Sequence, residues 1–290
     1  MRLTTVTRTS PLNSALKDGR VRPEGIEFAF EEVQPVTAAF RRMCRELAYD
    51  VTEMAATTYL VAREAGKPFT ALPIFLTRGF HHGAVKAREP GDPTAVEGKR
   101  VGVNRGYTVT TGVWARGILA SEYGVDLDRV TWVRSDVEHV AEYEPPANVE
   151  DLEAGKDLAE AVLAGELAAV VGDVKHPELV PLLADAEDAV RRYVARHDNW
   201  PVNHLVVVKD ELLEYAPAIF SAFERAKNVY VESGELEPLH ARAADLLGRR
   251  DPLPYGLEPN RGVLEELIDH AVRQKILRTR PDVDSLFAPV

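Results

Sequence analysis

The sequence predicts an α/β protein of two lobes, each a mostly parallel sheet flanked by helices. Three observations lead to this prediction. Strand and helix patterns alternate between residues 2 and 77, which is typical of parallel sheets whose crossovers are helices. A polar segment at 86–99 then carries two prolines and two glycines, which favours a crossover between lobes. Alternation resumes at residue 100.

Lobe 1 begins with strands and helices of ordinary length. Pro35 and Thr37 mark a helix start, and Gly66 marks a helix end. The continuous apolar run at 69–77 is typical of a buried strand. The expected elements are strands at 2–7, 26–30, 49–54 and 69–77, with a helix after the first strand and helices at 35–47 and 57–65.

Lobe 2 repeats the pattern before the chain returns. Its expected elements are strands at 100–103, 129–133 and 168–171 and helices at 107–123 and 156–164. One more strand is expected at 205–208, followed by helices at 211–233, 236–247 and 262–276. The predicted domains are therefore 1–98 plus 205–290 for lobe 1, which is discontinuous, and 99–204 for lobe 2.

Composition excludes several classes of protein. The chain has 290 residues, is 45% hydrophobic and 28% charged, and carries a net charge of −11. This acidity, without a run of Lys and Arg, argues against nucleic acid as a partner. No apolar leader and no membrane-spanning run is present, so we expect no membrane association and a cytoplasmic protein. Cys44 falls on an apolar helix face and is expected to be a core residue.

Polar side chains gather where the predicted strands end. Ligands of open α/β sheets bind outside the carboxyl ends of the strands, so we expect a ligand cleft between the lobes, lined by these residues. The candidates are Arg8, Glu53, Thr57, Arg78, His82, Arg105, Tyr107, Thr108, Thr110, Thr111, Asp173, Trp200, Asn203 and His204.

The segment 104–111 is the most informative of these. A strand, a glycine turn and a threonine-rich helix start offer backbone N–H groups to an anion, and Arg105 adds a forked donor for a carboxylate. The spacing is neither a dinucleotide fingerprint nor a P-loop. The alternative is that these threonines only cap the helix. Two interpretations also stay open for Arg78: it contacts the ligand, or it forms a structural ion pair.

Glu53 and Asp173 are the candidate buried acids, and each could be a general acid if burial raised its pKa; the alternative is a helix cap or hydrogen-bond acceptor. His81 and His82 are adjacent, so only one of them can face a cleft. No metal site is predicted, although a divalent ion held by one of these histidines with Glu53 and His204 stays open. Trp200 is expected either to stack on an aromatic ligand or to pack.

Long blocks of the sequence resemble the 4,5-dihydroxyphthalate decarboxylase family. They read YDVTEMAATTYLVAREAGKP, LPIFLTRGFHHGAV, GKRVGVNRGYTVTTGVWARGIL, DNWPVNHLVVVK and DPLPYGLEPNRGVLEELIDHAVRQKIL. The resemblance implies a fold similar to that of the type 2 periplasmic binding proteins. It also implies decarboxylation of a dihydroxylated aromatic diacid to protocatechuate and CO2, in phthalate degradation, without an organic cofactor.

Roles for the candidates follow from their positions at strand ends. Arg105, with the helix start at 108–111, would anchor the retained carboxylate, and Arg78 would contact the second carboxylate or a hydroxyl. Glu53 or His82 would donate the proton, while His204 or Asp173 would poise the phenol. Two alternatives stay open: a non-catalytic cytosolic protein that binds a small aromatic or anionic ligand, and an enzyme for a different hydroxylated aromatic acid. A homo-oligomer is also open.

Overall fold

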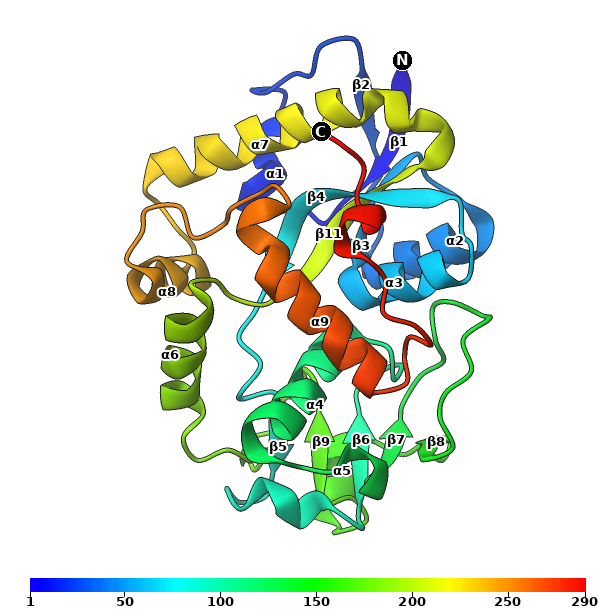
Figure 1. The fold of residues 1–290 in the computed structure, drawn as a ribbon, viewed down its shortest axis with the longest axis vertical. Coiled ribbons are helices and arrows are strands. Elements are labelled where there is room, and N and C mark those ends of the chain that lie inside the picture. The colour runs from blue at the N-terminus through cyan, green and yellow to red at the C-terminus, as the bar shows by residue number, and fades with distance from the viewer. The chain divides into compact units, whose positions relative to one another are not determined.

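A computed structural model describes all 290 residues. The chain divides into two compact units (Figure 1). Unit 1 comprises Met1–Gly79, His197–Glu265 and Pro281–Val290, and unit 2 comprises Phe80–Arg196 and Glu266–Arg280. Unit 2 thus begins at Phe80, whereas the domain boundary predicted from the sequence lies at residue 99. The ligand cleft predicted between the lobes stays a prediction.

The sheet of unit 1 has the strand order β2-β1-β3-β11-β4. Four of its strands run parallel to one another, and β11 alone is antiparallel, paired with β3 on one side and β4 on the other. The prediction of a mostly parallel sheet is therefore confirmed. The strands are β1 (Arg2–Val6), β2 (Glu27–Phe30), β3 (Val51–Ala55), β4 (Phe69–Arg78) and β11 (Val202–Lys209).

Helices cover the sheet of unit 1 with their apolar faces. Helix α2 buries Phe40, Met43 and Cys44, so the prediction that Cys44 is a core residue is confirmed. Figure 1 shows α1 alongside α7, although the two are far apart in the sequence. The helices are α1 (Pro11–Lys17), α2 (Thr37–Glu46), α3 (Ala56–Glu64), α7 (Ala216–Ser233), α8 (Pro238–Leu247) and α9 (Arg261–Arg273), which continues into unit 2.

The sheet of unit 2 has the order β10-β5-β9-β6-β7-β8, in which β5 alone runs against the others. Its strands are β5 (Val85–Ala87), β6 (Arg100–Val103), β7 (Thr131–Arg134), β8 (Val149–Asp151), β9 (Ala169–Val171) and β10 (Val180–Pro181). The segment 86–99 is thus no free crossover, because it supplies part of β5 and a short 3₁₀ helix at Pro93–Val96.

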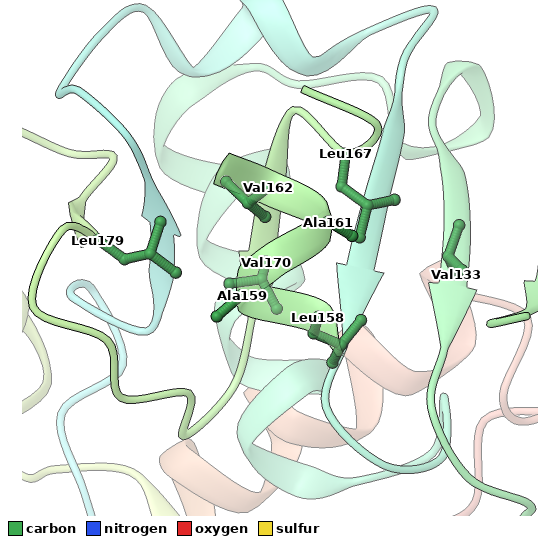
Figure 2. Close-up of a cluster of buried hydrophobic side chains, with 8 residues drawn as sticks. All are labelled: Val133, Leu158, Ala159, Ala161, Val162, Leu167, Val170 and Leu179. Carbon is green, nitrogen blue, oxygen red and sulfur yellow. The ribbon is translucent and has the colours of Figure 1, made fainter. Parts of the chain in front are cut away.

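The helices of unit 2 are α4 (Thr110–Tyr123), α5 (Leu158–Leu163) and α6 (Ala186–His197), whose last residue falls in unit 1. Figure 2 shows α5 lying on the sheet, with Leu158 and Val162 directed toward Val170 and its neighbours. Further 3₁₀ helices occur at Leu127–Arg129, Asp210–Tyr215, Glu258–Asn260 and Val283–Leu286. None of the helices combines the length and the apolar character that a membrane span requires.

Candidate functional site

Four polar residues meet at one edge of the unit 1 sheet. Glu53 lies near the end of β3 and Thr77 near the end of β4, while Arg8 follows β1 by two residues. His204 lies near the start of β11, which begins at this edge because it runs antiparallel. In the sheet register His204 is opposite Ala55 on β3 and Thr77 on β4. Residues two apart on a strand share a face, which places His204 diagonally beside Glu53.

Glu53 and His204 form a close pair. Nδ1 of His204 lies 2.6 Å from Oε1 of Glu53, whose side chain is 1% exposed. The backbone N–H of Arg8 donates to Oε2 at 2.8 Å, and the Thr77 hydroxyl is 3.4 Å from Oε1. Both carboxylate oxygens are therefore engaged by donors of the protein.

These donors decide the ionisation of Glu53. Burial alone raises the pKa of this carboxyl, but the hydrogen bond and positive charge of His204, together with Arg8, outweigh burial and lower the pKa below its usual value. A carboxylate that accepts several hydrogen bonds stays ionised. The structure thus corrects the expectation that burial makes Glu53 a general acid, and it favours the hydrogen-bond acceptor alternative.

The ring of His204 is held so that one nitrogen stays open. Nδ1 is committed to Glu53, and the Phe40 ring meets the imidazole edge-on at a centroid distance of 5.2 Å. Nε2 makes no hydrogen bond within the protein, and the side chain is 16% exposed. A carboxylate at Nδ1 fixes the tautomer and leaves Nε2 to exchange a proton. The pair is therefore equipped for acid–base work.

Arg8 brings a cation to the same cluster. Its side chain is exposed, and Nη2 donates to the Thr77 hydroxyl at 2.7 Å, which leaves further guanidinium donors available. The loop that carries it is fastened by the buried Asn13 of α1, whose Nδ2 donates to the Arg8 carbonyl at 2.8 Å. The structure thus places Arg8 where a carboxylate near His204 could be held.

Arg78 has a different environment from the one expected. The side chain is 4% exposed, and its guanidinium donates to the carbonyls of Trp200 and Pro254 and to the side chains of Asn199 and Asn260. Trp200 is fully buried, and its Nε1 donates to the Pro252 carbonyl at 2.6 Å. Neither side chain presents a free face to a ligand. Thr57 and Asn203 are also buried.

In unit 2 the segment 104–111 already holds an anion of the protein itself. The Glu138 carboxylate accepts the backbone N–H groups of Tyr107 and Thr108, at 2.7 and 3.1 Å, and the Thr108 hydroxyl at 2.7 Å. Arg134 pairs with Glu138 at 3.1 Å. These donors are therefore occupied by Glu138, whereas the sequence analysis offered them to a bound anion. Tyr107 and Thr110 are buried, and Thr111 is half-buried.

Arg105 keeps the features of an anion-binding residue. It adopts a left-handed backbone conformation with φ of 68°, and its N–H donates to the Ser135 hydroxyl at 2.8 Å. The guanidinium makes no hydrogen bond, and burial lowers its pKa against the opposing effects of Asp173 and Asp136. The prediction that Arg105 anchors a carboxylate stays a prediction.

The remaining two acid–base candidates, Asp173 and His82, lie in unit 2, and the role predicted for His82 stays a prediction. Asp173 is exposed, which contradicts the expectation of a buried acid. His82 is buried in unit 2, where its Nε2 lies 3.3 Å from Glu122, and Glu122 also pairs with Arg196. No group of three or more His, Cys, Asp or Glu side chains has an arrangement that could hold a metal ion.

Sequence reasoning missed three residues of these sites. Thr77 directly precedes Arg78 in the strand-end motif, and alternation along a strand would have shown that only one of the two can face His204. Phe40 and Glu138 had no such indication, because they reach their sites from a helix and an irregular segment distant in the sequence.

Comparison with known proteins places the chain. No protein-family model matches it. A 4,5-dihydroxyphthalate decarboxylase from Comamonas testosteroni is 30% identical over 315 aligned residues, covering 94% of this chain and 92% of the relative.

Solved structures agree in fold. The periplasmic aliphatic sulphonate binding protein SsuA from Escherichia coli matches with a TM-score of 0.57 at 10% identity, covering 99% of this chain and 97% of that chain. The desulfurization enzyme DszB matches with a TM-score of 0.55 at 15% identity, covering 99% and 96%. These likenesses confirm the periplasmic-binding-protein-like fold, and the close relative shows that the chain belongs to the 4,5-dihydroxyphthalate decarboxylase family.

Proposed function

We propose that the protein is a carboxy-lyase that converts 4,5-dihydroxyphthalate to protocatechuate and CO2, with His204 as the proton-transfer residue. The observation that carries this proposal is the 2.6 Å contact between Nδ1 of His204 and a buried carboxylate, which leaves Nε2 open. The family relationship supplies the substrate class.

Loss of CO2 from an aryl carboxylate consumes one proton. In the proposed reaction Nε2 of the His204 imidazolium donates this proton to the ring carbon that bears the leaving carboxylate, while the hydroxyl para to it pushes electrons into the ring. The carbon–carbon bond then breaks, CO2 leaves, and the electron pair of that bond restores the aromatic ring. His204 regains its proton from water, and Glu53 stabilises the imidazolium throughout.

Arg8 fits the carboxylate that is retained. A cation on the departing carboxylate would stabilise the ground state more than the transition state, because the negative charge leaves that group as the bond breaks. The exposed guanidinium of Arg8, tied to Thr77 beside Glu53, is therefore assigned to the other carboxylate, where it orients the ring toward His204.

The test is an assay of CO2 and phenolic product with purified protein and 4,5-dihydroxyphthalate. In D₂O the product should carry one deuterium at the vacated carbon. His204→Asn keeps an N–H donor for Glu53 but lacks Nε2, so kcat should fall by about 10²–10⁴-fold while the substrate still binds. His176→Asn, in unit 2, is the matched control. The same assay after dialysis against a chelator tests the expectation that no cofactor is needed.

Each other outcome has a meaning. Saturable binding without CO2 release would favour the non-catalytic binding protein, and CO2 release only from another hydroxylated aromatic acid would correct the substrate. Wild-type kcat in a folded His204→Asn protein would remove His204 from the mechanism.

A further inference from the structure

Arg78 joins three separate segments of unit 1 behind the candidate site. Its Nη1 donates to the Trp200 carbonyl at 2.8 Å and to Oδ1 of Asn199 at 3.2 Å. Its Nη2 donates to the Pro254 carbonyl at 3.1 Å and to Oδ1 of Asn260. We call this set of contacts the Arg78 cage. It links the end of β4 to the segments at 198–201 and 251–260.

The cage is buried and its members support one another. Asn199 and Asn260 are 3% and 0% exposed. Nδ2 of Asn260 donates to the carbonyls of Pro254 and Gly256, and Nδ2 of Asn199 donates to the Pro259 carbonyl at 2.7 Å. The four acceptors around Arg78 are neutral oxygens. Burying a cation among them is costly unless its donors are satisfied. Here Nη1 and Nη2 each have two acceptors, and these four contacts define the geometry of the cage.

This cage holds the start of the strand that carries His204. Val202 pairs with Arg78 and His204 with Thr77, so β11 has one more residue than β4 across this step. Further register shifts follow between His204 and Val206. Such bulges re-aim side chains next to active sites. The Gly79 N–H also donates to the Pro201 carbonyl at 3.2 Å, which fixes the chain immediately before the bulge.

We propose that Arg78 is a positioning residue, which acts through β11 to aim His204 at Glu53 and at the reacting carbon. This inference rests on the proposed function of the Glu53–His204 pair. The bulge alone does not fix the imidazole, because an irregular strand end can shift or slip. The cage removes that freedom by tying Asn199 and Trp200, which precede His204 by only a few residues, to the neighbouring strand.

Arginine is suited to this role and lysine is not. A guanidinium presents five donors in a rigid plane, whereas an ammonium is a compact charge with three donors on a flexible stem. Arg78→Lys keeps the charge, but it cannot reach four acceptors on two segments at once. The expected result is a displaced His204 in a protein that still folds.

The test combines a spectroscopic and a kinetic readout. The proton between Nδ1 of His204 and Glu53 is followed by ¹H NMR, and His204→Asn assigns its resonance. In Arg78→Lys this resonance should shift or disappear, and kcat should fall by about 10²-fold, since small misplacements of a reacting group cost about that much. KM should change little. Asn199→Ala, which cuts the cage at its link to β11, should act in the same direction.

Arg63→Lys is the matched control, because Arg63 is another arginine of unit 1 that donates to a backbone carbonyl and pairs with a carboxylate, here Phe69 and Asp210. It should leave the resonance and kcat unchanged. Wild-type resonance and kcat in folded Arg78→Lys or Asn199→Ala would overturn the inference. A lost resonance with wild-type kcat would support the cage and overturn the proposed role of His204, so the two ideas fail separately.

Discussion

Replacing Glu53 with glutamine changes one atom of the pair that we assign to proton transfer. Oε2 accepts the Arg8 N–H at 2.8 Å, so the glutamine oxygen must take that position to avoid two opposed donors. The amide NH₂ then faces Nδ1 of His204, which is 2.6 Å from the carboxylate in the native protein. The imidazole must accept at Nδ1 and therefore carry its hydrogen on Nε2.

The expected loss is large because both tautomer and charge change. The equivalent replacement in a Ser-His-Asp triad costs about 10⁴-fold in kcat, chiefly through the wrong tautomer. Proton transfer by a positioned group contributes about 10²–10⁴-fold. We therefore expect kcat of Glu53→Gln to fall by about 10²–10⁴-fold. The lost charge-assisted hydrogen bonds should lower the free energy of unfolding by about 1.5–3 kcal/mol.

CO2 release and urea unfolding are measured for the wild-type protein and for Glu53→Gln. Glu122→Gln is the matched control, since Glu122 also contacts a buried histidine, His82, at 3.3 Å, but lies in unit 2 outside the proposed catalytic pair. It should lose stability and keep kcat. A folded Glu53→Gln protein with wild-type kcat would refute the reasoning, and so would an equal loss of kcat in Glu122→Gln.

The stabilising effect of Glu53, measured against the same variant, should depend on pH. The folded-state pKa of Glu53 lies below its ordinary value of 4.5, so its ionised form stabilises the fold. This contribution is complete above the unfolded-state pKa and is lost as pH falls through the folded-state pKa. The difference in unfolding free energy between wild type and Glu53→Gln should therefore shrink as pH falls below 4.5. A difference that grows on acidification would contradict an ionised Glu53.

Two further predictions concern unit 2. In Gly117→Ala the added methyl group on α4 would lie 2.3 Å from the His270 ring on α9, so the free energy of unfolding, measured by thermal unfolding, should fall by about 1–3 kcal/mol. Gly262→Ala is the control, because nothing lies within 4 Å of the added methyl group, and it should be neutral or slightly stabilising. Equal stability of the two variants would contradict the close approach of Gly117 and His270. Arg105→Gln tests the sequence-based prediction that Arg105, as an alternative to Arg8, anchors the retained carboxylate. KM should then rise about tenfold through the lost charge-assisted hydrogen bonds, with little change in thermal stability because the guanidinium makes no hydrogen bond within the protein. An unchanged KM would remove Arg105 from substrate binding.

The sequence predicts elements well where one pattern dominates. The apolar run at 69–77 became β4 with almost the same bounds, because a continuous buried strand has no competing interpretation at that length. The short β5 was missed, since three residues inside a polar segment show no periodicity. Its place in the sheet depends on pairing with β9 and β10, which lie about 85–95 residues away along the chain.

Side-chain roles at strand ends were harder to predict than their positions. Arg78 and Arg8 are both arginines at the ends of apolar strands, yet one is enclosed by neutral acceptors and the other is exposed. The difference arises from segments near residues 200 and 255, whose approach to β4 no local pattern reveals. Likewise, Glu138 accepts hydrogen bonds from the backbone N–H groups of Tyr107 and Thr108, and no local pattern reveals its approach. An anion-binding helix start can be recognised locally, but its occupant cannot.

The antiparallel strand β11 explains why Glu53 and His204 form one pair. Glu53 lies near the end of a parallel strand, and only a strand entering from the opposite direction can begin at that edge between β3 and β4. Because side chains alternate along a strand, the register that sets His204 opposite Ala55 is also the register that turns its ring toward Glu53. A slip of one residue would turn the imidazole to the other face of the sheet. The acid–base pair thus depends on the register of β11, and the contacts that hold the start of β11, above all those of Arg78, belong to the same chemistry as the pair itself.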